Sequence, residues 1–350
     1  MFYKSKDGNA IPFYELCDKE YKDMVRLKQP YYGKSPILQN YISGIKNHDT
    51  AVDFIPSELK ELDTTLGGGF GPGLYIFGAN PGLGKTSLML HLMINLALMQ
   101  KHTLLFNLEM SPFQIITKLL SNYSYRKSLV DLDLKPKSIN ELSSHNNCFK
   151  ETALKEDVKQ LIRSFDDNVY KYINVISKCE DMDLQQDKQS NYVECIETAL
   201  KNYKEVYNIT PVIIIDFLQL LTSEDKNLVD RRLEMNNIID KLKKYSNVYK
   251  APIIVISSLS RHAYTKEVSD TENVDYNLSA FKESGMIEYQ ADFLAVLTRG
   301  KKIVDFAGED KTTINISILK TRYSSHTDET FSLVFRPEYS FFEELKEERK

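Results

Sequence analysis

One glycine-rich segment limits the folds that are open to this chain. It reads GANPGLGKTS (78–87), follows the apolar run LYIF (74–77) and precedes the apolar helical pattern SLMLHLMINLALM (87–99). Glycines let backbone N–H groups turn inward around a phosphate, and the following helix directs its positive N-terminal end at the same anion. This order of strand, loop and helix predicts a nucleotide-binding loop in an α/β protein, whereas an ordinary glycine-rich turn leaves the Gly-Lys-Thr sequence unexplained.

The spacing within the loop assigns a task to two side chains. The segment fits the pattern Ala or Gly, four residues, then Gly-Lys-Thr or Gly-Lys-Ser. In this pattern Lys85 reaches the β- and γ-phosphates, and the Thr86 hydroxyl binds Mg²⁺. We expect the nucleotide to be lined by Ala79, Asn80, Pro81, Gly82, Leu83, Gly84, Lys85, Thr86 and Ser87.

Two acidic residues follow predicted strands on the side where open α/β sheets bind ligands. Asp216 comes directly after the apolar run VIII (212–215), which favours a metal-site acid over a solvated surface carboxylate. Glu109 follows TLLF (103–106), where it could orient the water that attacks the nucleotide. It could equally supply a negative charge to the helix that begins near Ser111, and the sequence leaves these two readings open.

Strand and helix patterns alternate from residue 74 onward, which predicts a mostly parallel, twisted sheet with helices on both faces. The clearest helix is 234–249, where apolar residues recur at steps of three and four. The last two strand runs predict an antiparallel edge. Residues 125–210 are polar and predict helices with long loops. The predicted strands are 74–77, 103–106, 172–176, 212–215, 253–256, 293–297, 314–319 and 331–335.

Residues 1–52 predict a short N-terminal extension ahead of one ATPase-type domain at 53–345. Within the extension, SPILQNYISGIKNH (35–48) has the apolar spacing of a short amphipathic helix. Such a helix could pack on its own domain or dock on a neighbouring subunit.

Composition excludes several other classes. Lys plus Arg number 45 against 49 Asp plus Glu, so a nucleic-acid binder of this kind must concentrate positive charge locally. The apolar stretch 88–99 is too short to cross a bilayer, and the first residues contain no apolar core of a secretory signal. The four cysteines lack metal-site spacing, which makes the cytoplasm the expected compartment.

Taken together, the motifs resemble the C-terminal motor domain of DnaB-like replicative helicases, within the RecA-like class of hexameric ATPases. The resemblance covers about residues 53–342, with gaps in 125–210. Its strength lies in the order of several segments, since most of them would be weak alone. These segments are the stretch 54–87 that ends in the phosphate loop, FNLEMS (106–111), IIIDFLQLL (213–221), SAFKESGMIEYQAD (279–292) and ILKTR (318–322).

The resemblance implies a role for each matching residue. Glu109 would be the catalytic glutamate and Asp216 the acid that holds the metal's water shell. Lys320 and Arg322 would enter the neighbouring subunit's site and stabilise charge on the γ-phosphate, although a solvated edge strand is the simpler reading of these two residues alone. The DNA contacts would come from a loop that faces a central channel and contains Lys282, Glu283 and Gly285.

The implied function is an ATP- and Mg²⁺-dependent DNA helicase that acts as a ring, expected to be a hexamer, on single-stranded DNA or a forked duplex in replication. A primase or a loader would be a further partner. Three departures stand against a simple transfer: Ser258 replaces the family's usual glutamine, YSSHTDE (323–329) replaces a glycine turn, and the N-terminal region is short. The alternative is therefore a nucleotide-switched DNA-binding or loading ATPase that does not unwind.

Overall fold

A nine-stranded sheet runs through the described part of residues 54–345 in the computed structural model, in the order β11-β10-β9-β8-β3-β7-β6-β4-β5. The six strands from β8 to β5 are parallel. The strands are β3 (Gly73–Ala79), β4 (Thr103–Asn107), β5 (Ile173–Ser177), β6 (Val212–Asp216), β7 (Pro252–Ser258), β8 (Phe293–Val304), β9 (Asp310–Thr321), β10 (Thr330–Arg336) and β11 (Phe341–Glu344).

Seven of the eight strand runs expected from the sequence lie within these strands, and the run expected at 172–176 overlaps β5 from Ile173, because Tyr172 ends a short 3₁₀ helix. The expected antiparallel edge is confirmed, because β9 pairs antiparallel with both β8 and β10. The sequence analysis missed β11, which extends this edge by pairing with β10. Its sequence, FFEE, is too short to produce a recognisable alternation of apolar and polar residues.

The chain divides into two units, Met1–Asp53 and Phe54–Lys350. In the first, only the backbones of β1 (Phe2–Lys4) and β2 (Ala10–Pro12) are described, and they pair antiparallel. The sequence did not predict this pair, and the expected helix within 35–48 lies outside the described residues. In the second unit the described ranges are 54–143, 156–177, 191–225, 227–228, 230–259, 281, 285–304, 310–326 and 329–345.

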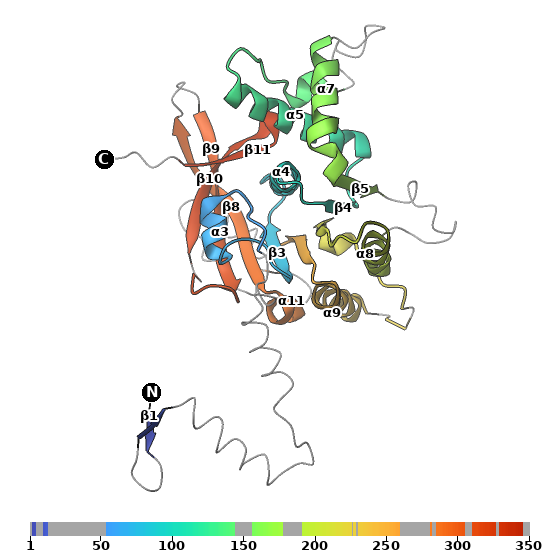
Figure 1. Cartoon of the computed structure of the whole chain (residues 1–350), viewed down its shortest axis with the longest axis vertical. Coiled ribbons are helices and arrows are strands. Elements are labelled where there is room, and N and C mark those ends of the chain that lie inside the picture. Colours follow the sequence, from blue (N-terminus) through green and yellow to red (C-terminus); the bar gives the residue numbers. More distant parts are fainter. Residues whose placement is uncertain are drawn as a thin grey trace. The chain divides into compact units, whose positions relative to one another are not determined.

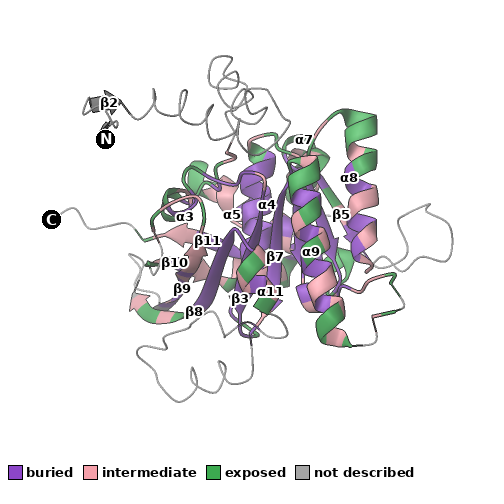
Figure 2. Ribbon diagram, turned by 90° about the horizontal axis from the view of Figure 1, so that it is seen from below, coloured by how far each residue is buried: buried purple, intermediate pink, exposed green. Residues whose placement is uncertain are grey.

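Helices cover both faces of the sheet, as the alternating pattern predicted (Figure 1). Side chains of β3 alternate between the faces: Tyr75 and Phe77 belong to one buried cluster, and Leu74 and Ile76 to the other. The first cluster lies under α4 (Lys85–Leu98), α5 (Pro112–Val130) and α7 (Glu156–Asn168), and the second under α8 (Val193–Tyr207), α9 (Arg231–Tyr249) and α11 (Gly285–Gln290). The central strands β3, β4, β6 and β7 are therefore buried on both sides, as Figure 2 shows for β3 and β7.

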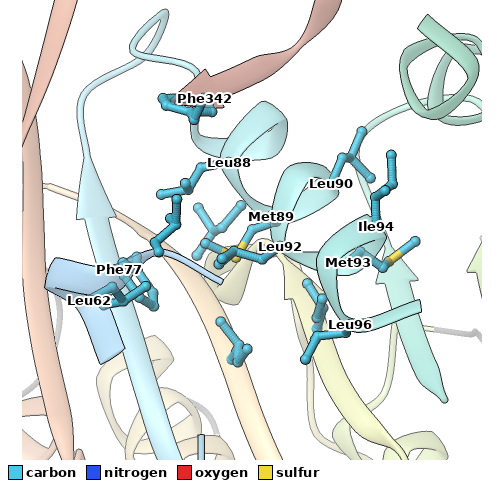
Figure 3. Close-up of a cluster of buried hydrophobic side chains, with 14 of the residues drawn as sticks. Leu62, Phe77, Leu88, Met89, Leu90, Leu92, Met93, Ile94, Leu96 and Phe342 are labelled. Atoms are coloured by element: carbon cyan, nitrogen blue, oxygen red, sulfur yellow. The ribbon is translucent and has the colours of Figure 1, made fainter. Parts of the chain in front are cut away.

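The helix α4 is buried on almost every side, because residues 87–97 are all buried. Most of these residues are apolar, and a helix with apolar residues on nearly every side is stable only when protein surrounds it. The helix α4 contacts the sheet through β4 and β11, and it packs against α5 as well. This packing holds the start of α4, and with it the glycine loop, in one place. Figure 3 shows part of the cluster, including Leu62, Phe77, Leu88, Met89, Leu90, Leu92, Met93, Ile94, Leu96 and Phe342.

The polar region 125–210 contains the predicted helices: the end of α5, α6 (Ile139–Leu142), α7 and α8. It also contains β5, at the edge of the sheet, where YINVI predicted a strand. The helix expected at 234–249 lies within α9, which starts three residues earlier. No helix in the described ranges combines the length and apolar character that crossing a membrane requires.

Candidate active site

The glycine loop connects the end of β3 to the start of α4. Gly82 and Gly84 have φ of 82° and 80°, a region in which glycine carries little strain, and Gly84 is the N-cap of α4. A Cβ atom added to Gly82 would meet nothing within 4 Å, whereas one added to Gly84 would lie 2.9 Å from the Phe335 ring. One side of the loop is therefore open, while its other end is packed against β10.

The two polar side chains at the start of α4 are already held by hydrogen bonds. Lys85 Nζ donates to the carbonyl oxygen of Ala79 at 2.9 Å, so the lysine folds back over the loop. The Thr86 hydroxyl donates to Asp216 Oδ2 at 2.7 Å. The structure thus brings Lys85 and Thr86, which the motif spacing singled out, close to Asp216, which was expected after a buried strand.

Burial changes the acidity of both charged groups. Asp216 ends the buried strand β6 and is 2% exposed, and this burial raises the pKa of its carboxyl group although the Thr86 hydrogen bond acts in the opposite direction. Burial likewise lowers the pKa of Lys85, and the negative charges of Asp216 and Glu109 oppose that shift. Burial therefore disfavours the charged forms of both Asp216 and Lys85. A divalent cation near Asp216 and a phosphate near Lys85 would offset this cost.

Glu109 lies exposed at the tip of a tight turn between β4 and α5. Asn107 closes the turn by accepting a hydrogen bond from Met110 N–H and donating one to the Met110 carbonyl. The turn is tied to the metal-site strand, since Leu108 N–H donates to the Asp216 carbonyl oxygen at 2.9 Å. The N-terminus of α5 is capped instead by Ser111 and Gln114, which form a capping box.

A second lysine, which sequence reasoning missed, lies at this site. Lys118 on α5 approaches Ser87 Oγ at 3.4 Å, and burial lowers its pKa while the charge of Asp216 opposes the shift. The available signal was its position on the buried face of α5, between Ile115 and Leu119. A lysine on the apolar face of a helix is uncommon and needs a nearby anion or a polar partner.

A cavity of about 260 Å³ opens beside the glycine loop. This cavity was not predictable from the sequence, because its walls come from segments more than 200 residues apart. Phe335, one of its lining residues, stacks on Phe342 with ring centroids 4.5 Å apart. The cavity is lined by Gly82, Leu83, Arg299, Lys311, Thr312, Ile314, Phe335, Pro337 and Glu338.

Lys320 and Arg322 lie where the parallel strands β3 and β8 begin, whereas their own glycine loop follows the other end of β3. Arg322 N–H donates to the Asp292 carbonyl, and Asp292 N–H donates to Leu74, near the start of β3. The loop follows the other end of β3, about 20 Å away at the usual rise of a strand. Within one subunit, Lys320 and Arg322 therefore stand apart from the site that contains Lys85.

Both side chains have partners in their own subunit. Lys320 Nζ donates to the carbonyl oxygens of Glu288 and Tyr289 at the end of α11. Arg322 donates to the Tyr289 carbonyl at 2.7 Å and pairs with Asp292 at 3.2 Å, with 48% of its side chain exposed. The arginine therefore retains access to solvent.

Most of the residues expected to contact DNA lie outside the described ranges. Lys282 and Glu283 lie outside them, and Gly285 is the first residue of α11. Ser258 ends β7, where it pairs with Ala79 at the end of β3.

Residues 55–344 match the model of the DnaB-like helicase C terminal domain. The chain belongs to this family. It is 27% identical over 318 residues to the replicative DNA helicase DnaB of Geobacillus stearothermophilus, covering 89% of this chain and 62% of that protein. It is 28% identical over 308 residues to a probable plasmid replicative DNA helicase of Chlamydia muridarum, covering 86% of this chain and 57% of that protein. The chain thus spans about three fifths of the length of these relatives.

Solved structures of DnaB-like proteins share the fold. A DnaB-like replicative helicase, whose interactions with primase were described with its structure, superposes with a TM-score of 0.66 at 20% identity, covering 96% of this chain and 73% of that one. A solved ATPase domain is matched over its whole length, with 90% of this chain covered, a TM-score of 0.66 and 21% identity. The RecA-like α/β fold expected from the sequence is confirmed.

Proposed function

We propose that this chain is an ATP-driven DNA translocase that unwinds duplex DNA as a ring, with six subunits. The observation that carries the proposal is the contact between Thr86 and Asp216 beside the open side of the glycine loop, with Lys85 and Glu109 next to it. The family to which the chain belongs and the helicases among its relatives support the same function.

The described residues fit a nucleoside triphosphate and Mg²⁺. The open face at Gly82 leaves room for phosphate oxygens, and Lys85 supplies a positive charge. Thr86 and Asp216 would hold Mg²⁺, which when bound neutralises phosphate charge. Glu109, on the exposed turn joined to Asp216, would orient the attacking water and accept its proton. The nucleoside would lie in the cavity beside Phe335.

A second subunit is needed to complete this site. Lys320 and Arg322 lie at the end of the strands opposite to their own loop, so they would act on a neighbour's nucleotide. A closed ring supplies such a neighbour to every subunit. We propose single-stranded or forked DNA as the substrate, and a primase or a loader as a further partner.

The alternative is a nucleotide-switched DNA-binding or loading ATPase that does not separate strands. Ser258 favours it, because a serine is too short to take the place of the family's glutamine without a bridging water. A forked-duplex unwinding assay beside an assay of DNA-stimulated ATP hydrolysis separates the two functions. Strand separation is the expected result. Stimulated hydrolysis without strand separation would favour the alternative.

Two variants test the assigned parts. Lys85→Ala should abolish ATP hydrolysis, and hydrolysis at the parent rate would reject the nucleotide site. Lys282→Ala should weaken binding to single-stranded DNA and reduce its salt dependence, because one phosphate contact is lost. Unchanged affinity and salt slope would move the DNA path to other basic residues, of which Arg261, Lys301 and Lys302 are the next candidates.

A further inference from the structure

One side chain joins the turn after β6 to the end of β7. Gln219 lies in the short helix η2 (Leu218–Leu220), three residues after Asp216. Its Oε1 accepts a hydrogen bond from Ser258 N–H at 3.0 Å, and its Nε2 donates to Ser257 Oγ at 3.0 Å. Because a backbone N–H can only donate, the contact with Ser258 determines which end of the carboxamide faces the strand.

The turn that carries Gln219 is held from a second element. Arg231, at the start of α9, donates to the carbonyl oxygens of Gln219 at 2.9 Å and Leu221 at 3.1 Å. Arg231 is itself paired with Glu234 at 2.6 Å. The backbone of Gln219 is thus anchored independently of its side chain, so the carboxamide acts as a short, positioned link to β7.

On one side, the end of β7 pairs with the end of β3, directly before the glycine loop. Ser257 and Ser258 pair with Gly78 and Ala79 at the end of β3. The carbonyl of Ala79 is the group that accepts the hydrogen bond from Lys85 Nζ. A shift of the end of β7 would therefore move the Ala79 carbonyl that holds Lys85.

On its other side, β7 leads directly to the segment from which DNA contacts are expected. Leu259 follows Ser258 and forms an antiparallel bridge with Phe281, the residue before Lys282. The side chains of Leu259 and Phe281 pack over Gly78, since a Cβ added to Gly78 would lie 2.6 Å from both.

We propose that Gln219 is a positioning residue through which single-stranded DNA stimulates ATP hydrolysis. It links the strand that carries Asp216 to the strand end that precedes Leu259 and Phe281. The Gln219 side chain reaches the backbone of Ser258 from the turn that follows the neighbouring strand β6. This inference rests on the proposed function, because it concerns the response of ATP hydrolysis to DNA.

The test compares Gln219→Ala, Gln219→Glu and the control Gln160→Ala, which changes an exposed residue on α7. The full chain is assayed for ATP hydrolysis with and without a single-stranded oligonucleotide, for the kcat and KM of ATP, and for oligonucleotide affinity. Gln219→Ala should lower the stimulation of kcat by about 2- to 30-fold, the range typical of coupling residues, while the oligonucleotide still binds. Gln160→Ala should behave as the parent.

Gln219→Glu should restore most of the stimulation. Its carboxylate can accept from Ser258 N–H, and the Ser257 hydroxyl can reverse its role and donate. A residue with a merely structural role would not produce loss with alanine and recovery with glutamate at equal thermal stability. Ser257→Ala removes one of the two hydrogen bonds without touching Gln219, and should give a smaller loss of stimulation in the same direction.

Unchanged stimulation in a folded Gln219→Ala protein would overturn the inference. If that variant fails to fold, unchanged stimulation in Ser257→Ala would overturn it instead. A parent protein whose ATP hydrolysis ignores single-stranded DNA would overturn the proposed function itself, and that result is distinct because it appears before any variant is made.

Discussion

The hydroxyl of Thr86 donates a hydrogen bond to Asp216 Oδ2 across 2.7 Å, and so joins the first turn of α4 to the end of β6. The two residues are 130 positions apart in the chain. Their contact orients the carboxylate toward the glycine loop before any ligand is bound, which lowers the cost of arranging the site when Mg²⁺ and phosphate arrive.

Asp216→Asn tests the charge in this contact separately from its geometry. The amide oxygen can still accept from Thr86, but the negative charge that attracts the hydrated cation is lost. We expect ATP hydrolysis to fall by about 10- to 100-fold, as for other groups around a metal's water shell. Steady-state hydrolysis measured across a Mg²⁺ titration is the appropriate assay.

The control for this prediction is Asp166→Asn, which removes an exposed carboxylate on α7. It should hydrolyse ATP at the parent rate. If Asp216→Asn also does so at low Mg²⁺, Asp216 has no part in holding the cation.

Glu109→Gln should bind ATP but hydrolyse it about 10²- to 10⁴-fold more slowly, the usual contribution of a general base. The amide has the same size as the carboxylate. The substitution should leave the turn intact, because Asn107 closes that turn and Glu109 does not cap α5. Nucleotide binding and single-turnover hydrolysis are measured on the same preparation. Glu205→Gln on α8 is the matched exposed control. Parent-like turnover in Glu109→Gln would remove the catalytic assignment.

Arg322→Ala should lower ATP hydrolysis by about 10³-fold or more, the contribution typical of an arginine supplied by a neighbouring subunit. If Arg322 were only a half-exposed surface charge, its removal would change the free energy of unfolding by about 0.5 kcal/mol or less and would leave turnover intact. Hydrolysis and thermal unfolding, measured together, distinguish these results.

Mixing Arg322→Ala with Glu109→Gln subunits tests whether the arginine acts on its neighbour. Some interfaces in a mixed ring join an intact Glu109 to an intact Arg322, so part of the activity should return. Rings shown to contain both subunits but without recovered hydrolysis would contradict action across the interface.

We expect acidification to lower the free energy of unfolding through His91. It is buried against Phe341 and close to Arg126, and burial, followed by the charge of Arg126, lowers its pKa well below the usual value. Below about pH 6.5 the unfolded chain binds a proton at His91 that the folded chain does not. The free energy of unfolding therefore decreases by up to about 1.4 kcal/mol for each unit by which the pH is lowered. This contribution is complete above that pH and is lost as pH falls toward the folded-state pKa.

His91→Gln should flatten this pH dependence, since glutamine can still accept the hydrogen bond from Phe342 N–H but does not titrate. Denaturant unfolding of the two proteins between pH 5 and 8 gives the comparison. The carboxylates of Glu58, Glu343 and Glu344, which line the cavity next to His91, are common to both proteins. Parallel stability profiles would show that His91 is not the group responsible.

Much of the fold was predictable because its signals are local. Buried parallel strands such as VIII (212–215) and IIVI (253–256) are continuous apolar runs, and α9 repeats its apolar residues at helical spacing. The strand β11 was missed because four residues are too few to show a period. Its place is determined by pairing with β10 rather than by its own sequence.

The sequence by itself determined the glycine loop, Lys85 and Thr86, because the residues that build this part of the site are contiguous and their backbone conformations are set locally. It also determined that Asp216 would end a buried strand. Only the tertiary structure decided that Lys118 approaches Ser87, that Gln219 contacts the end of β7, and that Arg322 lies at the end of the strands opposite to its own loop. These relationships depend on which strands are neighbours in the sheet and on how helices pack across it, and long-range packing free energy settles that order without leaving a periodic signal in the chain.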